Sequence, residues 1–259
     1  MDSTVFTVLL VSGVLGVIVV VGDPPPPPYS PGVGKHVYIV NSGRNWFDAQ
    51  AYCRQYYTDL SSVGSAWEEA QLQSAASSQS TYYAWIGLYR DGNSPTQWSW
   101  SGGGPVTYLG WQQNQPSNYY REYAVAIRMD GWHDYNPYNT HNFFCVRLIP
   151  VAESKTWEEA MEYCKEHYTN LASLLSATEV RQAQTQSTQS HTTTPYRWTG
   201  LVYLSDTWLW VNGDPMKYSG WPAGGGQLCP AWNFRCGAIG PNGYWDNRDC
   251  QESLNFICY

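Results

Sequence analysis

Charged side chains are scarce in this sequence, and positive ones are scarcer than negative ones. Asp, Glu, Lys and Arg make up 14% of the 259 residues, and the formal net charge is -7. Lys and Arg nowhere form a run. Nucleic acids and anionic membranes are bound by clustered positive charge. The sequence therefore argues against nucleic acid as a partner and against binding to an anionic membrane surface.

Common catalytic signatures are absent as well. The chain contains no His-Glu-x-x-His, no Gly-x-Ser-x-Gly and no Cys-x-x-Cys motif. The Gly-rich stretch 224–226 lacks the strand, helix and lysine that surround a phosphate-binding loop. The five histidines are scattered at spacings that no metal-binding motif shares: His36, His133, His141, His167 and His191. We therefore expect a protein that is not an enzyme.

Residues 1–22 are typical of a secretory signal peptide. Val5 to Val21 is almost wholly apolar, and small residues up to Gly22 would allow cleavage before Asp23. No Lys or Arg precedes the apolar run, so an uncleaved membrane anchor is the alternative, although the run is short for a span. In either case the remainder faces an oxidising compartment, where cysteines pair as disulfides. We expect a secreted protein, in which a membrane is involved only if this segment is retained. Residues 23–35 contain five consecutive prolines and are expected to form a stiff spacer.

Tryptophan and tyrosine are abundant, with 14 and 21 copies, and they reveal an internal repeat. Trp46 and Trp157 lie 157 − 46 = 111 positions apart, and Trp85 and Trp198 lie 198 − 85 = 113 positions apart. Offsets between 110 and 113 recur in these pairs: Cys53/Cys164, Leu60/Leu171, Ser65/Ser176, Gly87/Gly200, Trp98/Trp208, Trp100/Trp210, Trp111/Trp221, Trp132/Trp245 and Cys145/Cys258. The sequence therefore predicts two tandem copies of one domain, at 36–146 and 147–259.

Each copy is expected to begin with a short strand and a capped helix. The strands are predicted at 36–40 and 146–149. Thr156 and Glu159 form a capping box in the second copy, and Asn45 has the corresponding place in the first. A second box opens a polar helix in each copy: Ser65-Ala66-Trp67-Glu68 and Ser176-Ala177-Thr178-Glu179. Further strands of the first copy are predicted at 84–89, 97–100, 124–129 and 143–146.

The seven cysteines cannot all pair within one chain. The first copy holds only two, and repetition extends its bridge to the second copy, so three bridges are predicted: Cys53–Cys145, Cys164–Cys258 and Cys236–Cys250. At the offset of 113, Cys236 and Cys250 correspond to Tyr123 and Pro137, so the first copy lacks the third bridge. Cys229 is left over, either as a free thiol or as a disulfide link between two chains.

Taken together, these residues resemble the C-type lectin-like domain, present twice. The first copy carries the pattern in Trp46, Cys53, Leu60, Trp85-Ile86-Gly87-Leu88, Trp98-Ser99-Trp100, Gly110-Trp111, Trp132-His133-Asp134 and Cys145. The second carries it in Trp157, Cys164, Leu171, Trp198-Thr199-Gly200-Leu201, Trp208-Leu209-Trp210, Gly220-Trp221, Cys236, Trp245-Asp246-Asn247, Cys250 and Cys258. The tandem pair after a signal peptide is similar to the mannose-receptor-like lectins of fish. The resemblance implies an α+β fold in which each domain has two helices, two small antiparallel sheets and a long loop region.

The resemblance also implies a place for calcium in the long loop, because sugar-binding members of the family hold a calcium ion there with oxygen ligands. The first-copy residues at the family's ligand positions are Gln115, Ser117 and Asp134, and Glu122 lies one position after the family's glutamate. In the family, the proline at position 116 follows a cis bond. Ser117 offers only a hydroxyl, and Arg121 stands where the family has a glutamate. We therefore expect weak or absent calcium binding in this copy.

The remaining candidate ligand-binding residues of the first copy are Tyr119, Tyr120 and His133. The two tyrosines could stack on a sugar ring, and His133 replaces the asparagine of the family pattern. The second copy lacks the triplet altogether, and Asp246-Asn247 inverts the family order. The resemblance thus implies a secreted lectin that recognises glycans or glycoproteins on cells or microbes. It also implies a role in innate immunity. The alternative is a calcium-independent, protein-binding module or an anchored receptor ectodomain.

Overall fold

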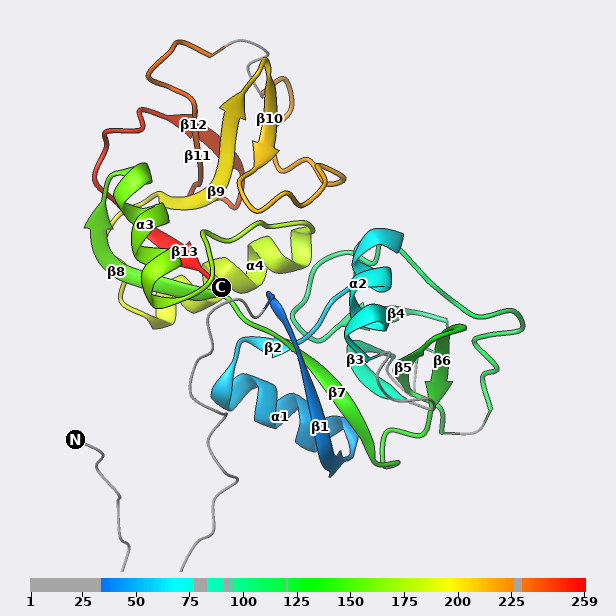
Figure 1. Ribbon diagram of the computed structural model, residues 1–259. Coiled ribbons are helices and arrows are strands. Elements are labelled where there is room, and N and C mark those ends of the chain that lie inside the picture. Colours follow the sequence, from blue (N-terminus) through cyan, green and yellow to red (C-terminus); the bar gives the residue numbers. More distant parts are fainter. Residues whose placement is uncertain (1–33, 77–82, 91–93, 95, 120, 226–229) are drawn as a thin grey trace, which may run out of the picture.

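The computed structural model describes residues 34–76, 83–90, 94, 96–119, 121–225 and 230–259. The predicted signal peptide, most of the spacer, Tyr120 and Cys229 lie outside these residues. Two α+β domains follow each other along the chain, each with two helices and one sheet. Figure 1 shows the first domain in blue to green and the second in yellow-green to red. The predicted fold class is therefore confirmed.

The first domain is built on a central strand that carries Trp85-Ile86-Gly87-Leu88. Its sheet has the order β1-β7-β3-β5-β6, with β2 added to β7 and β4 added to β3. The elements are β1 (His36–Arg44), α1 (Trp46–Tyr56), β2 (Asp59–Leu60), α2 (Ala66–Ala76), β3 (Ala84–Arg90), β4 (Trp98–Trp100), β5 (Ala124–Arg128), β6 (Gly131–Tyr135) and β7 (His141–Val146). Strand β3 is buried at every position except Tyr89, because strands lie on both sides of it.

The second domain repeats this plan. Its sheet has the order β12-β11-β9-β13-β8, with β10 added to β9. The elements are β8 (Ile149–Lys155), α3 (Trp157–His167), α4 (Ala177–Gln189), β9 (Arg197–Leu204), β10 (Thr207–Trp210), β11 (Cys236–Ile239), β12 (Trp245–Arg248) and β13 (Leu254–Cys258). In each domain the last strand pairs with the first, which brings the two ends of the domain together.

Two features of the sheets differ from the expectation. The strands of each domain join into one hydrogen-bonded sheet rather than two, because β3 pairs in parallel with β7 and β9 pairs in parallel with β13. The strand predicted at 146–149 was wrong. Val146 ends β7 by pairing with His36, whereas Ile149 begins β8 by pairing with Cys258, so the segment divides between the two domains.

The glycine of the repeated strand has a packing role in both domains. A Cβ atom at Gly87 would lie 3.1 Å from the carbonyl oxygen of Leu60, and one at Gly200 would lie 2.9 Å from that of Leu171. Each glycine amide also donates to the neighbouring backbone, to Ser61 in the first domain at 2.8 Å. A close backbone approach therefore explains why glycine stands here.

The capped helices form as predicted. The Thr156 side chain accepts from the Glu159 amide while the Glu159 carboxylate accepts from the Thr156 amide, which is a complete capping box. Asn45 caps α1 by accepting from the Asp48 amide. The second helices differ in one respect: Glu179 reaches past the cap residue and accepts from the amide of Leu175 at 2.8 Å.

All three predicted disulfides are present, at Cys53–Cys145, Cys164–Cys258 and Cys236–Cys250. The strand register corrects one correspondence. Cys236 pairs with Val202 just as Ala124 pairs with Tyr89, so Cys236 takes the place of Ala124 and not of Tyr123. The outer bridges tie each first helix to each last strand, and both are fully buried in their cores.

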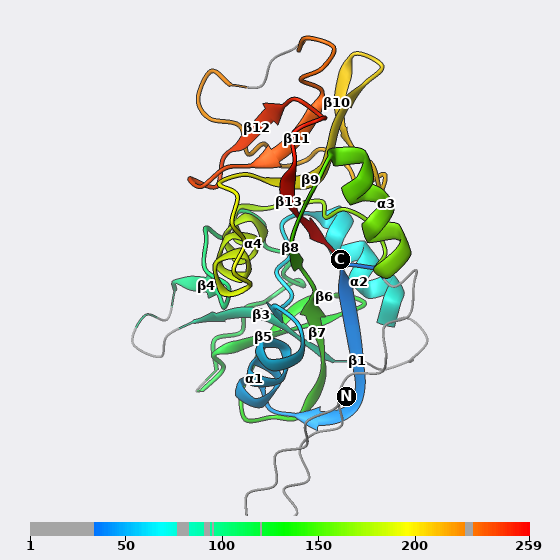
Figure 2. The same cartoon turned by 90° about the vertical axis from the view of Figure 1, so that its left-hand side faces the viewer.

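The two domains are packed against each other. Trp67 of α2 lies against the core of the second domain. In addition, Leu148 exchanges two hydrogen bonds with the hydroxyl of Thr58, at 2.8 and 3.2 Å. In both Figures 1 and 2, α2 and α4 lie in the zone where the domains meet. The interface therefore contains the second helix of each copy.

Candidate functional site

The long loop of the first domain runs from β4 to β5 and carries most of the predicted ligand-binding residues. Two backbone hydrogen bonds fasten its first part to β6: the Trp132 amide donates to Gly110 at 2.8 Å, and the Gln112 amide donates to Trp132 at 3.1 Å. The rings of Trp98 and Trp111 pack at 5.0 Å. These contacts fasten the start of residues 112–119 to β6, the edge strand of the sheet.

The structure brings the four predicted metal ligands together. The Asp134 carboxylate accepts from the backbone amides of Ser117 and Asn118, at 2.7 and 2.9 Å. The Ser117 hydroxyl donates to Glu122 at 2.7 Å, and the Gln115 side-chain oxygen accepts from the Ser117 amide at 3.0 Å. The peptide bond between Gln115 and Pro116 is cis, as the resemblance implied. The residues that the family resemblance pointed to therefore lie together in the structure.

An arginine that sequence reasoning missed stands beside this cluster. Arg90, the last residue of β3, is only 3% exposed at its side chain. Its guanidinium donates to the Asn118 side chain at 2.5 Å and to the Glu122 carbonyl at 2.9 Å, and lies 3.9 Å from the Asp134 carboxylate. The ring of Trp98 covers it at 5.1 Å. A fixed positive charge is therefore built into the loop.

This arrangement does not fit a calcium ion. Calcium requires several oxygen atoms with lone pairs directed to one point, at about 2.3–2.6 Å. Here the Asp134 and Glu122 oxygens are directed to amide and hydroxyl donors of the loop itself. The Arg90 guanidinium also occupies the loop oxygens of Asn118 and Glu122, to which it donates at 2.5 and 2.9 Å. Oxygen atoms that could bind calcium are present, but they already accept hydrogen bonds from the chain's own amide and hydroxyl groups.

The other predicted residues fall into different places. Tyr119 is 72% exposed, and its amide donates to Glu122 at 2.9 Å, so the loop presents this ring to solvent. His133 is buried, and its Nε2 lies 3.2 Å from an oxygen of Asp130. Since His133 and Asp134 are successive residues of β6, they point to opposite faces of the sheet. His133 is therefore separate from the cluster, and Tyr120 lies outside the described residues.

The corresponding region of the second domain also pairs its carboxylate with an arginine. Arg248 lies 3.5 Å from Asp246 and 2.6 Å from Glu252. Asn247, which takes the place of Asp134, donates from its side chain to the Phe234 carbonyl at 3.3 Å. Trp232 in the same loop is 81% exposed. Asn247 therefore makes a different contact from Asp134, which accepts from two amides of the loop.

The comparison with known protein families agrees with the two-domain fold. The model of the Lectin C-type domain matches residues 42–147 and 153–259. The chain therefore belongs to the C-type lectin domain family, with two tandem copies. C-type mannose receptor 2 of Rattus norvegicus is 27% identical over 262 residues, which cover 83% of this chain and 17% of the relative.

A second receptor and a solved structure are also similar to this chain. The secretory phospholipase A2 receptor of Bos taurus is 22% identical over 259 residues, covering 84% of this chain and 17% of the relative. The crystal structure of human lithostathine is 25% identical, with a TM-score of 0.41, and covers 47% of this chain and 89% of that chain. The chain thus spans 17% of the length of the receptors that it matches. Within the part of the chain that the structure describes, we find no helix of the length and apolarity needed to cross a membrane.

Proposed function

We propose that this protein recognises glycans or glycoproteins through the long loop of its first domain, without calcium at that loop. The observation that carries the proposal is the position of Arg90 against Asp134 and Asn118. A buried guanidinium supplies the positive charge that a calcium ion supplies in sugar-binding relatives. The loop is therefore ordered by the chain's own hydrogen bonds.

The ring of Tyr119 is the group proposed to contact the ligand. Its 72% exposure places an aromatic face next to the polar cluster. Sugars present apolar C–H faces as well as hydroxyls, so an exposed tyrosine can stack on one face and donate from its hydroxyl. Family membership and the relation to a mannose receptor support a sugar as the ligand class. We propose glycans of cell surfaces or microbes as the source, and a secreted form of the protein.

A protein partner is the second candidate, and two exposed apolar side chains that line one pocket of the second domain favour it. Trp232 and Leu204 are exposed by 81 and 51%. Isolated exposed rings are ordinary, but large aromatic side chains are also the residues that most often anchor protein interfaces. Under this reading the chain is a calcium-independent binding module, either secreted or held at a membrane by residues 1–22.

A glycan array distinguishes the two candidates. We expect the purified chain to bind a defined set of glycans equally well in calcium and in a chelating buffer. Tyr119→Ala should weaken that binding by about tenfold or more, because loss of an aromatic anchor costs about 1.4 kcal/mol or more. Tyr138→Ala is the matched control, since Tyr138 is 70% exposed in the turn between β6 and β7. Equal binding by both variants, or no glycan bound in either buffer, would contradict the proposal.

Association through Cys229 is a separate proposal, because the seventh cysteine has no partner in the sequence pattern. We propose that it links two chains and so doubles the number of binding loops, which raises avidity. A non-reducing gel of the secreted protein is the test. A dimer that Cys229→Ser abolishes supports the link, and monomer alone rejects it.

A further inference from the structure

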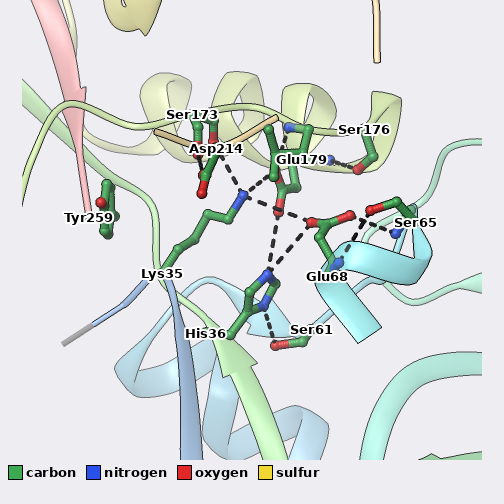
Figure 3. Close-up of polar contacts among 12 residues, drawn as sticks. Lys35, His36, Ser61, Ser65, Glu68, Ser173, Ser176, Glu179, Asp214 and Tyr259 are labelled. Carbon is green, nitrogen blue, oxygen red and sulfur yellow. Dashed lines mark hydrogen bonds and ion pairs between the residues drawn. The ribbon is translucent and has the colours of Figure 1, made fainter. Parts of the chain in front are cut away.

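Four ionisable side chains meet in the interface between the domains. Figure 3 shows Lys35, His36, Glu68 and Glu179 pointing toward one another from β1, α2 and α4 and the residue before β1. Their side chains are 6, 12, 2 and 0% exposed, in that order. The first three belong to the first domain and Glu179 to the second. Ionisable groups are rarely buried together unless something balances their charge.

The two glutamates are the same residue of the repeat, since 179 − 68 = 111. Each has one oxygen occupied by the loop before its helix. The Glu68 Oε2 accepts from the Gly64 amide at 2.9 Å, and the Glu179 Oε2 accepts from the Leu175 amide at 2.8 Å. These bonds fix both carboxylates and direct the Oε1 atoms into the interface. Packing of the domains thus places two carboxylates face to face.

The free oxygens converge on the imidazole of His36. Its Nε2 lies 3.7 Å from Glu68 Oε1 and 3.9 Å from Glu179 Oε1. Both the His36 Nε2 and the Glu179 Oε1 are buried without a hydrogen-bond partner. On the other side of the ring, Nδ1 lies 2.9 Å from the Ser61 hydroxyl. When Nδ1 carries the proton, it donates to Ser61, and the lone pair of Nε2 is then directed at the two carboxylates.

The charge of this cluster is not balanced by the chain alone. Lys35 donates to Glu179 Oε2 at 2.8 Å and lies 4.0 Å from Glu68. Asp214 lies on the far side of Lys35 in Figure 3, so three carboxylates surround one ammonium group. One ammonium and three carboxylates leave two negative charges in excess, and a divalent cation would bring this sum to zero.

We propose that His36 Nε2, Glu68 Oε1 and Glu179 Oε1 form a transition-metal site, with zinc as the ion that it suits best. Their ligand atoms all lie within 4.8 Å of one another. A tetrahedral zinc ion bound at about 2.0–2.2 Å holds its ligands about 3.4 Å apart. Closure therefore requires the two carboxylate oxygens to approach Nε2 from 3.7 and 3.9 Å, and to approach each other from within their present limit of 4.8 Å. One imidazole with two carboxylates suits zinc and leaves a fourth position for water, whereas calcium takes six to eight oxygens.

A cavity of about 340 Å³ lies beside the cluster. It is lined by Lys35, His36, Trp67, Asp214 and Tyr259, among others, but not by Glu68 or Glu179. A metal bound in the cluster would join His36 and Glu68 of the first domain to Glu179 of the second. It would therefore stabilise the relative arrangement of the two domains, because the complete ligand set exists only when they are packed.

Zinc titration of the full chain tests this inference. The protein is stripped with a chelator and titrated against a zinc indicator in millimolar calcium, in a Cys229→Ser background because a thiol could bind zinc. We expect one zinc per chain and a zinc-dependent rise in thermal stability. His36→Gln should weaken zinc binding by about tenfold or more, as loss of a ligand does. His191→Asn, outside the cluster, should bind as the parent does.

Two further measurements test the proposed site independently of the His36→Gln variant. Ser61→Ala removes the partner of Nδ1 and should also weaken zinc binding, even if His36→Gln fails to fold. Cobalt should give the visible absorption of a four-coordinate site in the parent chain. The inference is overturned if the parent shows no saturable zinc binding, or if the His36 and Ser61 variants bind zinc as tightly as the parent. Either result would leave the four side chains as a buried polar network without a metal ion.

Discussion

Arg90 shows at the scale of one residue how hydrogen bonds of the chain itself order the long loop of the first domain. The sequence identified the carboxylate and amide residues of the loop, because they follow a family pattern at fixed spacing. It did not identify Arg90, which follows the predicted strand 84–89 and lies 28 positions from Asn118 and 32 from Glu122. The sequence suggested Arg121 as the nearby cation. Only the pairing of β3 with β5 brings Arg90 to the loop.

His141 is a second residue whose role depends on its surroundings. Its ring packs among Tyr83, Trp85 and Tyr135, with ring centroids 5.3, 4.6 and 5.5 Å away. Burial among these rings lowers its pKa from 6.5 to about 4. The folded state therefore keeps the imidazole neutral at a pH where the unfolded chain protonates it. The stability that depends on this neutral ring is present above pH 6.5 and is lost as the pH falls toward 4.

We predict that His141→Phe reduces the loss of stability between pH 6.5 and 4. Phenylalanine fills the same aromatic cage and has no proton to bind. Urea unfolding of the first domain at several pH values measures the effect. His167→Phe, on the exposed end of α3, is the control and should keep the pH dependence of the parent. An identical pH dependence in His141→Phe and the parent would show that His141 is not responsible.

At the scale of elements, the sequence predicted what depends on local spacing. The capping box of α3, the cap of α1 and the two outer disulfides follow from residues whose separations repeat between the copies, and Cys236–Cys250 follows from the two cysteines that the first copy lacks. The joining of all strands into one sheet was not predictable in this way. The parallel pairing of β3 with β7 and of β9 with β13 links segments that are distant in sequence, and apolar patterns do not specify a partner.

Asn255 explains one irregularity of that sheet. The register between β13 and β8 shifts between Leu254 and Phe256, and Asn255 lies in this interval, fully buried. Its side-chain oxygen accepts from the amides of Thr193 and Thr194, both at 2.7 Å, and its nitrogen donates to Ala152 at 2.6 Å. One amide group thus satisfies backbone atoms that the shifted ladder leaves without partners.

We predict that Asn255→Ala lowers the free energy of unfolding of the second domain by about 2–4 kcal/mol, because several buried backbone groups lose their partner. Asn242→Ala, in an exposed turn, should change it by less than about 0.5 kcal/mol. Urea denaturation followed by tryptophan fluorescence measures both. Equal stability of the two variants would mean that water replaces the amide without cost.

At the scale of the whole molecule, the repeat predicted two domains but not how they meet. Ser65 and Ser176 were recognised as caps of equivalent helices, and each accepts from the glutamate amide three positions on. Nothing in their spacing indicates that Glu68 and Glu179 are buried against each other. That burial depends on the contact between domains, as does the placement of His36. The interface therefore brings together ionisable side chains of both copies in an arrangement that neither copy has alone.

The central claim is that the first domain's loop is held by Arg90 in place of calcium. The most direct test is calcium titration of the full chain, followed by tryptophan fluorescence and thermal unfolding, with Arg90→Gln measured beside it. The account predicts no saturable change at millimolar calcium in the parent. It also predicts that Arg90→Gln is less stable, by about 2–4 kcal/mol, because Asp134 loses its cation. A saturable shift in the parent that Asp134→Ala abolishes would contradict the account and establish a calcium site.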